Sequence, residues 1–123
     1  MARTIESEKY IEKKLKDEVR RRGGIALKFS SGSEVGFPDR CVLLPGGRCY
    51  WVELKTTGEK PRAIQRYRHN QLRRLGFEVF VIDSTNLINQ FINTVWQEDL
   101  YLTRRRSELV ITTSATISFI NKG

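Results

Sequence analysis

The chain has few of the residues that bind zinc in proteins. Of its 123 residues, only His69 is a histidine, and only Cys41 and Cys49 are cysteines. Neither cysteine has the Cys-x-x-Cys spacing or a neighbouring histidine that a zinc site needs. Both stand beside β-prone residues, so we interpret them as small core or cross-strand residues and not as a disulfide.

Long hydrophobic runs are also absent. No stretch approaches the roughly 20 apolar residues of a membrane span, and the first ten residues carry no apolar signal-peptide core. We therefore expect a soluble, cytoplasmic protein.

Acidic residues are scarce relative to basic ones. The chain holds 22 lysines and arginines against 14 acidic residues, which gives a net charge of +8, and 39% of its residues are hydrophobic. The length and apolar content suit one domain with one modest core. The basic excess favours phosphate-rich partners, although charge alone does not separate DNA from RNA or an anionic membrane.

Hydrophobic periodicity predicts the order αβββαβ. Ile11, Leu15 and Val19 recur every four residues in a helix over 7–22, which Ser7 caps and two glycines close. Strands are expected over 25–29, 40–44, 48–55 and 77–82, and a second helix over 62–75, with Ile64, Leu72 and Leu75 facing inward. The strand, helix, strand unit at 50–82 implies parallel pairing through a right-handed crossover.

Beyond Asp83 the pattern weakens. Leu87, Phe91 and Val95 indicate another amphipathic helix, and 109–119 is β-prone. We therefore divide the chain into a core at 1–83 and a segment at 84–123 that belongs to the same domain or serves in dimerisation. Its tail is open to three interpretations: an added strand, an arm exchanged with a partner, or a disordered end.

The hairpin at 40–55 carries the clearest chemical signal. A three-residue loop at 45–47 would pair Leu44 with Arg48 and place Asp39 opposite Glu53, with Lys55 on the same face. Directly opposed Cβ atoms lie roughly 4.5 to 5.5 Å apart. Two carboxylates at that distance repel each other unless a cation lies between them, so the register predicts a divalent metal site.

The same residues resemble a known nuclease pattern. Pro38-Asp39 followed by Glu53-x-Lys55 on an αβββαβ chain resembles the PD-(D/E)xK superfamily. The stretches at 36–40, 43–48 and 52–55 are similar to the VRR-NUC family, as is the later spacing of Gln65, His69, Leu72 and Gly76. The resemblance covers about 8–83 and implies a restriction-endonuclease-like α/β fold, with a mixed four-stranded sheet flanked by helices.

Metal-assisted phosphodiester hydrolysis fits these residues. The reaction needs a nucleophilic water and relief of charge on the phosphate, and a metal held by carboxylates supplies both. Asp39, Glu53 and the backbone carbonyl of Leu54 would hold Mg²⁺ or Mn²⁺, which retains water ligands. Lys55 would orient the water and offset developing charge. The sequence does not decide between one metal ion and two.

The two helices supply further candidates. The resemblance suggests that Glu8 or Glu12 reaches the metal. Family spacing favours Glu12 and the helical wheel favours Glu8, and of the two we select Glu12 as the catalytic acid. Gln65 would bond a phosphate oxygen or a catalytic water, and His69 has a supporting role at most. The proposed contacts to DNA phosphates are Arg40, Lys60, Arg62, Arg66, Arg68 and Arg73.

Two functions from different classes follow. The first is a metal-dependent endonuclease that cleaves branched or junction DNA, as a homodimer similar to Holliday-junction resolvases, with 95–102 and the tail as candidate interface. The second is a non-catalytic nucleic-acid-binding module, which explains the charge but leaves the opposed acids without a purpose.

Overall fold

The computed structural model describes residues 4–96, and the described chain up to Ile92 forms one compact unit. Its elements are α1 (Glu8–Arg21), β1 (Ile25–Lys28), β2 (Arg40–Leu44), β3 (Arg48–Leu54), α2 (Ala63–Arg74) and β4 (Val79–Ile82). Residues 85–96 are helical as well. The predicted αβββαβ order is confirmed.

Local chemistry sets both ends of α1. The side chain of Ser7 accepts a hydrogen bond from the backbone N–H of Tyr10 at 3.1 Å, as expected of an N-cap. Ile11, Leu15 and Val19 are fully buried, so the predicted apolar stripe faces the sheet. After the helix, Gly24 passes so close to β2 that an added Cβ would lie 2.6 Å from the carbonyl oxygen of Leu43.

The sheet has the order β1-β2-β3-β4. The pairs β1/β2 and β2/β3 are antiparallel, and β3/β4 is parallel, as the crossover predicts. β1 lies at the edge of the sheet, where Ile25 is 60% exposed. On β2 and β3 the free thiols of Cys41 and Cys49 are in contact, with their Sγ atoms 2.9 Å apart.

The tight turn between β2 and β3 fixes their register. Gly46 and Gly47 have φ of +89° and +73°, which residues with a Cβ rarely adopt. Leu44 pairs with Arg48, as predicted, and Cys41 pairs with Trp51. The loop therefore consists of the three residues 45–47. With this register, the carboxylates of Asp39 and Glu53 lie on one face of the sheet.

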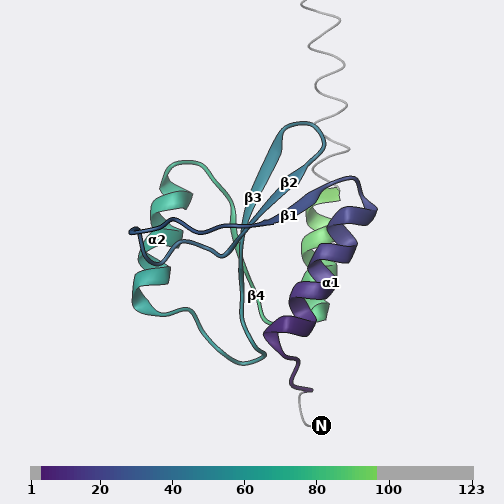
Figure 1. Cartoon of the computed structure of the whole chain (residues 1–123), viewed down its shortest axis with the longest axis horizontal. Helices are drawn as coiled ribbons and strands as arrows, with labels where there is room; N and C mark the ends of the chain where they lie inside the picture. Colours follow the sequence, from purple (N-terminus) through teal and green to yellow (C-terminus); the bar gives the residue numbers. More distant parts are fainter. Residues whose placement is uncertain (1–3, 97–123) are drawn as a thin grey trace, which may run out of the picture. The chain divides into compact units, whose positions relative to one another are not determined.

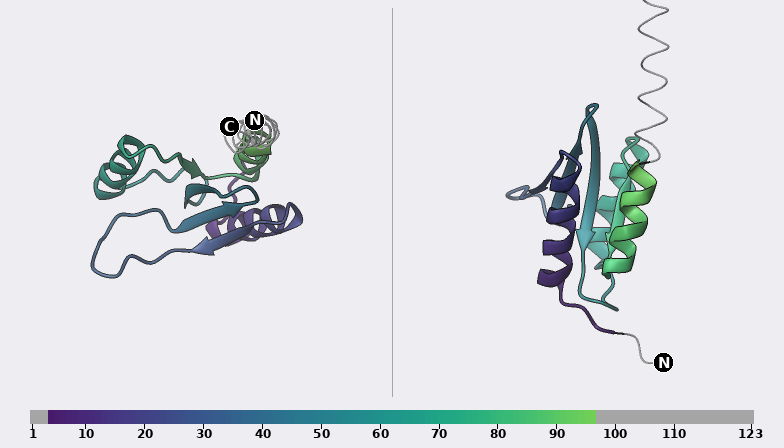
Figure 2. Two further views of the ribbon diagram at one scale, coloured as in Figure 1. Left: turned by 90° about the horizontal axis from the view of Figure 1, so that it is seen from above. Right: turned by 90° about the vertical axis from the view of Figure 1, so that its right-hand side faces the viewer.

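Two layers of helices cover the sheet (Figures 1 and 2). α1 and the helix that begins at residue 85 lie against one face, and α2 lies against the other. Phe91 packs edge-on against Tyr50 and Phe80, with ring centroids 6.0 and 4.8 Å apart. The compact unit thus extends past residue 83, to Ile92. Most of the predicted interface at 95–102 and all of the β-prone tail lie outside the described residues.

The inner face of α2 differs from the prediction. Leu72 is buried, as predicted, but Ile64 is 37% exposed and Leu75 is 69% exposed. The prediction of an inward side chain is therefore wrong for two of the three residues. Gln65 and His69 face inward instead, at 7% and 2% exposure. The helix therefore presents polar side chains to the sheet at the position where Glu53 lies.

No helix in the described part of the chain is both long enough and apolar enough to cross a membrane.

Candidate active site

Asp39 and Glu53 lie side by side where β2 begins and β3 ends. The backbone N–H of Asp39 donates to Glu53 Oε2 at 3.2 Å, and the backbone N–H of Leu54 donates to Asp39 Oδ1 at 3.2 Å. Each carboxylate therefore accepts a hydrogen bond from the strand that carries the other. The geometry is the one that the three-residue loop predicts.

Desolvation raises the pKa of both acids. Glu53 is only 4% exposed, and desolvation, with the nearby Asp39 as second cause, raises its pKa to about 7. Desolvation also raises the pKa of Asp39, although hydrogen bonds from the backbone of Leu54 and of Asp39 itself oppose the change. The pair holds more negative charge than its surroundings neutralise, so a bound cation would be favoured.

Lys55 and Gln65 complete the contacts of Glu53. Lys55 Nζ lies 3.5 Å from Glu53 Oε1, and its side chain is 14% exposed. Gln65 Nε2 donates to the same oxygen at 2.6 Å, while Gln65 Oε1 accepts from the backbone N–H of Arg62 at 2.8 Å. The amide of Gln65 thus connects the first turn of α2 to Glu53 and fixes the direction of the carboxylate.

The donor set fits a hard cation that keeps water ligands. Within the described residues, no cluster of three or more histidine, cysteine or acidic side chains is arranged to hold a metal. Two carboxylates are present, and Asp39 Oδ2 makes no hydrogen bond or ion pair with the described part of the chain. Mg²⁺ typically takes one or two carboxylates and completes its shell with water and substrate phosphate, so this pair suffices.

The two candidate acids on α1 differ in their partners. Glu12 forms an ion pair with Arg40, with 2.6 Å between Oε1 and Nη2. Glu8 makes no ion pair with any described side chain. Its pKa is raised by desolvation and by repulsion from Asp39, and lowered by attraction to Lys55. Its backbone N–H donates to Thr56 Oγ1 at 3.3 Å, which holds the start of α1 beside the residue after Lys55.

The predicted phosphate contacts fall into three groups. Arg40 is 6% exposed and bound to Glu12, so it is a buried ion-pair residue and not a surface contact, contrary to the sequence-based expectation. The second group forms contacts within the chain: Arg68 pairs with Glu34 at 2.9 Å, and Arg73 donates to the carbonyl of Val79 at 2.9 Å.

The third group remains open to solvent. Lys60, Arg62 and Arg66 are exposed and gather at the N-terminal end of α2, next to Gln65. These three are the residues of the predicted set that best suit contact with a nucleic acid.

His69 is more deeply placed than a lone histidine suggests. It lies one turn after Gln65 on the inner face of α2, and its Nε2 has no hydrogen-bond partner in the described structure. Desolvation, together with the positive charges of Arg73 and Lys55, lowers its pKa, so the imidazole is neutral at pH 7. Gln65 and His69 are four residues apart, so they share one face of α2, and no apolar residue takes their place on that face. This spacing is the signal in the sequence that could have identified His69 as an inward residue.

Comparison with known proteins identifies the family of the chain. No family model matches the sequence. The chain is 50% identical over 80 residues to "Putative nuclease p44" of Acyrthosiphon pisum secondary endosymbiont phage 1, which covers 65% of this chain and 86% of that protein. A solved structure described as "VRR_NUC domain" superposes with a TM-score of 0.67 at 30% identity, covering 72% of this chain and 97% of the other. The chain therefore belongs to the VRR-NUC family of nucleases, with a restriction-endonuclease-like fold.

Proposed function

We propose that this nuclease is a deoxyribonuclease that hydrolyses phosphodiester bonds with Mg²⁺ or Mn²⁺ held by Asp39 and Glu53. The observation that carries the proposal is the hydrogen-bonded pair of opposed carboxylates, of which Glu53 is buried and has an amine 3.5 Å away. A bound divalent ion would supply a water that is nucleophilic near neutral pH and would withdraw charge from the phosphate. Burial raises the pKa of both acids, and a bound cation would favour their charged forms in that desolvated setting.

The side chains around the pair have separate tasks. Lys55 is a cation beside Glu53, suited to hold the attacking water and to balance charge that builds on the phosphate. Gln65 orients Glu53 through its 2.6 Å hydrogen bond, so it acts as a positioning residue. Leu54 would offer its backbone carbonyl as a third ligand.

Glu8 is the acid of α1 that we assign to this site. Glu12 is already neutralised by Arg40, whereas Glu8 interacts electrostatically with both Asp39 and Lys55. The carboxylate of Glu8 is thus available to accept a hydrogen bond from a metal-bound water. Glu12 keeps an indirect role, because with Arg40 it forms the ion pair next to Asp39.

DNA is the proposed substrate because the chain is strongly basic, with a net charge of +8. Lys60, Arg62 and Arg66 would contact phosphates on the side of the site where α2 begins. We extend the proposal to branched DNA and to a homodimer, for which the support is the family resemblance alone. A measurement of molecular mass in solution tests the dimer.

Cleavage of end-labelled DNA tests the activity. Linear duplex, flap and four-way junction are incubated with Mg²⁺, with Mn²⁺ and with EDTA, and the products are separated on gels. We expect metal-dependent cleavage that Asp39→Asn and Glu53→Gln each reduce by at least about 100-fold. Glu34→Gln removes an equivalent charge from an exposed loop and is the matched control.

Full activity in Asp39→Asn, or cleavage in EDTA, would exclude the proposed chemistry. Binding without cleavage of every substrate would favour the non-catalytic module. That alternative is the weaker one, because it keeps a buried Glu53 beside a second acid, Asp39, at a cost in stability and gains nothing from the pair.

A further inference from the structure

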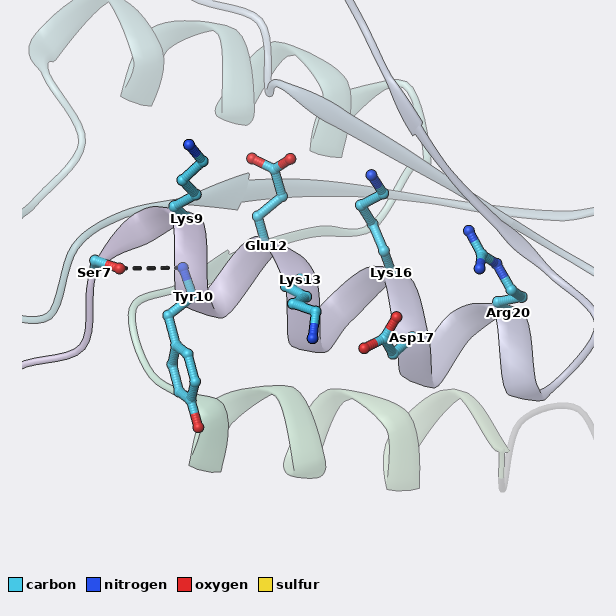
Figure 3. Close-up of a pocket in the computed structure, with 8 residues that line it drawn as sticks. All are labelled: Ser7, Lys9, Tyr10, Glu12, Lys13, Lys16, Asp17 and Arg20. Carbon is cyan, nitrogen blue, oxygen red and sulfur yellow. Dashed lines mark hydrogen bonds between the residues drawn. The ribbon is translucent and has the colours of Figure 1, made fainter.

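The outer face of α1 carries a row of basic side chains that the proposed catalytic site does not use. Lys9, Lys13, Lys16 and Arg20 follow one another at steps of four, three and four residues, which places them on one side of the helix. All four are exposed. They line a pocket of about 560 Å³ along the helix (Figure 3).

These four charges differ from the other cations of the same helix. Lys14, Arg21 and Arg22 all form ion pairs with Glu18, at 3.4, 3.3 and 2.7 Å. None of the four residues in the row forms an ion pair with the described part of the chain. The helix therefore separates a neutralised cluster from an unneutralised row.

Two acids also line the pocket, and neither cancels the row. Glu12 is bound to Arg40 at 2.6 Å, so its charge is already balanced. Asp17 is the other acid, and it leaves the lining with an excess of positive charge. An anionic partner is therefore favoured there.

We propose that this basic row binds the sugar-phosphate backbone of a DNA duplex that leads away from the catalytic site. The inference rests on the proposed function, because it assumes that DNA reaches Asp39 and Glu53. It adds a contact surface on α1 to the one expected at the start of α2.

The dimensions suit a nucleic-acid strand. At a rise of 1.5 Å per residue, the row from Lys9 to Arg20 spans about 16 Å. One strand of B-DNA carries a phosphate for every 3.4 Å of axis, so a row of this length is long enough to contact more than one phosphate of a strand. A second hollow of about 290 Å³, lined by Lys16, Arg20 and the start of β1, lies beside the far end of the row.

The row is also continuous with the catalytic site. Glu12 borders it and holds Arg40, the residue directly after Asp39. Glu8 precedes Lys9 and interacts electrostatically with Asp39 and Lys55. A backbone bound along α1 thus approaches the carboxylates at the N-terminal end of the helix.

An anionic membrane fits this face less well. A helix that lies in a membrane interface inserts apolar side chains next to its basic ones. The aliphatic residues Ile11, Leu15 and Val19 are fully buried against the sheet. Tyr10 is the large hydrophobic residue that the helix exposes, so the face offers charge with little apolar anchorage.

Two charge-matched double variants test the proposal. Lys13→Gln with Lys16→Gln removes two charges from the row, and Lys14→Gln with Arg21→Gln removes two neutralised charges from the same helix. Binding to a fluorescent duplex is measured by anisotropy in EDTA at several salt concentrations. Each phosphate contact contributes about 0.9 to the magnitude of the slope of log affinity against log salt. The Lys13/Lys16 variant should therefore reduce the magnitude of this slope by about 1.8.

The control variant should keep the wild-type slope, and Lys13→Arg with Lys16→Arg should keep it too. Equal slopes in the wild type and in the Lys13/Lys16 variant would overturn the inference, and so would an equal loss in the Lys14/Arg21 variant. Because the assay contains no metal, it is independent of catalysis. A wild-type chain that binds with the expected slopes but cleaves nothing would refute the proposed function and leave this inference standing.

Discussion

The raised pKa of Glu53 leads to a quantitative prediction about how the stability of the fold depends on pH. The pKa of Glu53 is about 7 in the folded chain against 4.5 for an ordinary glutamate, mainly because burial disfavours the charged form. Between these two pH values, the folded chain binds a proton that the unfolded chain has released. Stability therefore falls as the pH rises through this window, with a total cost of about 3 kcal/mol above it.

The substitution Glu53→Gln removes this cost. Evaluated with the two pKa values, the penalty grows by about 2.5 kcal/mol between pH 5 and pH 8. The variant should thus gain about that much stability relative to the wild type over this range. A loss of about 1 kcal/mol that does not depend on pH offsets part of this gain, because glutamine has one acceptor oxygen for the two donors on Asp39 and Gln65.

Urea denaturation in EDTA at pH 5 and pH 8 measures the difference. The two proteins should diverge with pH, and the variant should be the more stable one at pH 8. A difference in unfolding free energy that stays constant with pH would refute the assignment of a charged, desolvated carboxylate to Glu53. Adding Mn²⁺ at pH 8 should stabilise the wild type and have little effect on the variant.

Three further substitutions probe other parts of the account. Lys55→Met should lower the cleavage rate at least about 100-fold while Mn²⁺ binding, measured by calorimetry, persists. Gln65→Ala removes the amide from both Glu53 and the N–H of Arg62, so it should cost about 1–2 kcal/mol in denaturation experiments. Gly36→Ala should destabilise the fold by at least about 1 kcal/mol, because φ is +92° and a Cβ would lie 2.7 Å from the carbonyl oxygen of Ile64. Unchanged values in these assays would contradict the corresponding roles.

The hairpin could be predicted from the sequence because its signals are local. Side chains alternate along a strand, and the glycines of the 45–47 loop supply the positive φ values that its turn needs. Together they determine the register, and the register brings Asp39 to Glu53. A shift of one residue would have separated the two acids across the sheet.

The inner face of α2 could not be predicted in the same way. Hydrophobicity selects Ile64 and Leu75 as core residues, but the space under the helix is occupied by the buried carboxylate of Glu53. A buried carboxylate needs hydrogen-bond donors, so Gln65 faces inward and the neighbouring Ile64 is left partly exposed.

The prediction of a phosphate contact at Arg40 was wrong for a related reason. The charge of Arg40 indicates a surface contact. Side chains alternate along β2, however, and the side chain of Arg40 lies on the face that α1 covers, where it forms the ion pair with Glu12. Ion pairs between distant segments leave no pattern in a single sequence. The same limit applies to the choice between Glu8 and Glu12, which depends on which of them Arg40 neutralises.

Calorimetric titration of the metal-free protein with Mn²⁺ tests the central claim most directly, which is that Asp39 and Glu53 hold a divalent cation. We predict saturable binding by the wild type at pH 8 and no binding by Asp39→Ala. Binding of equal strength and stoichiometry in Asp39→Ala would contradict the account.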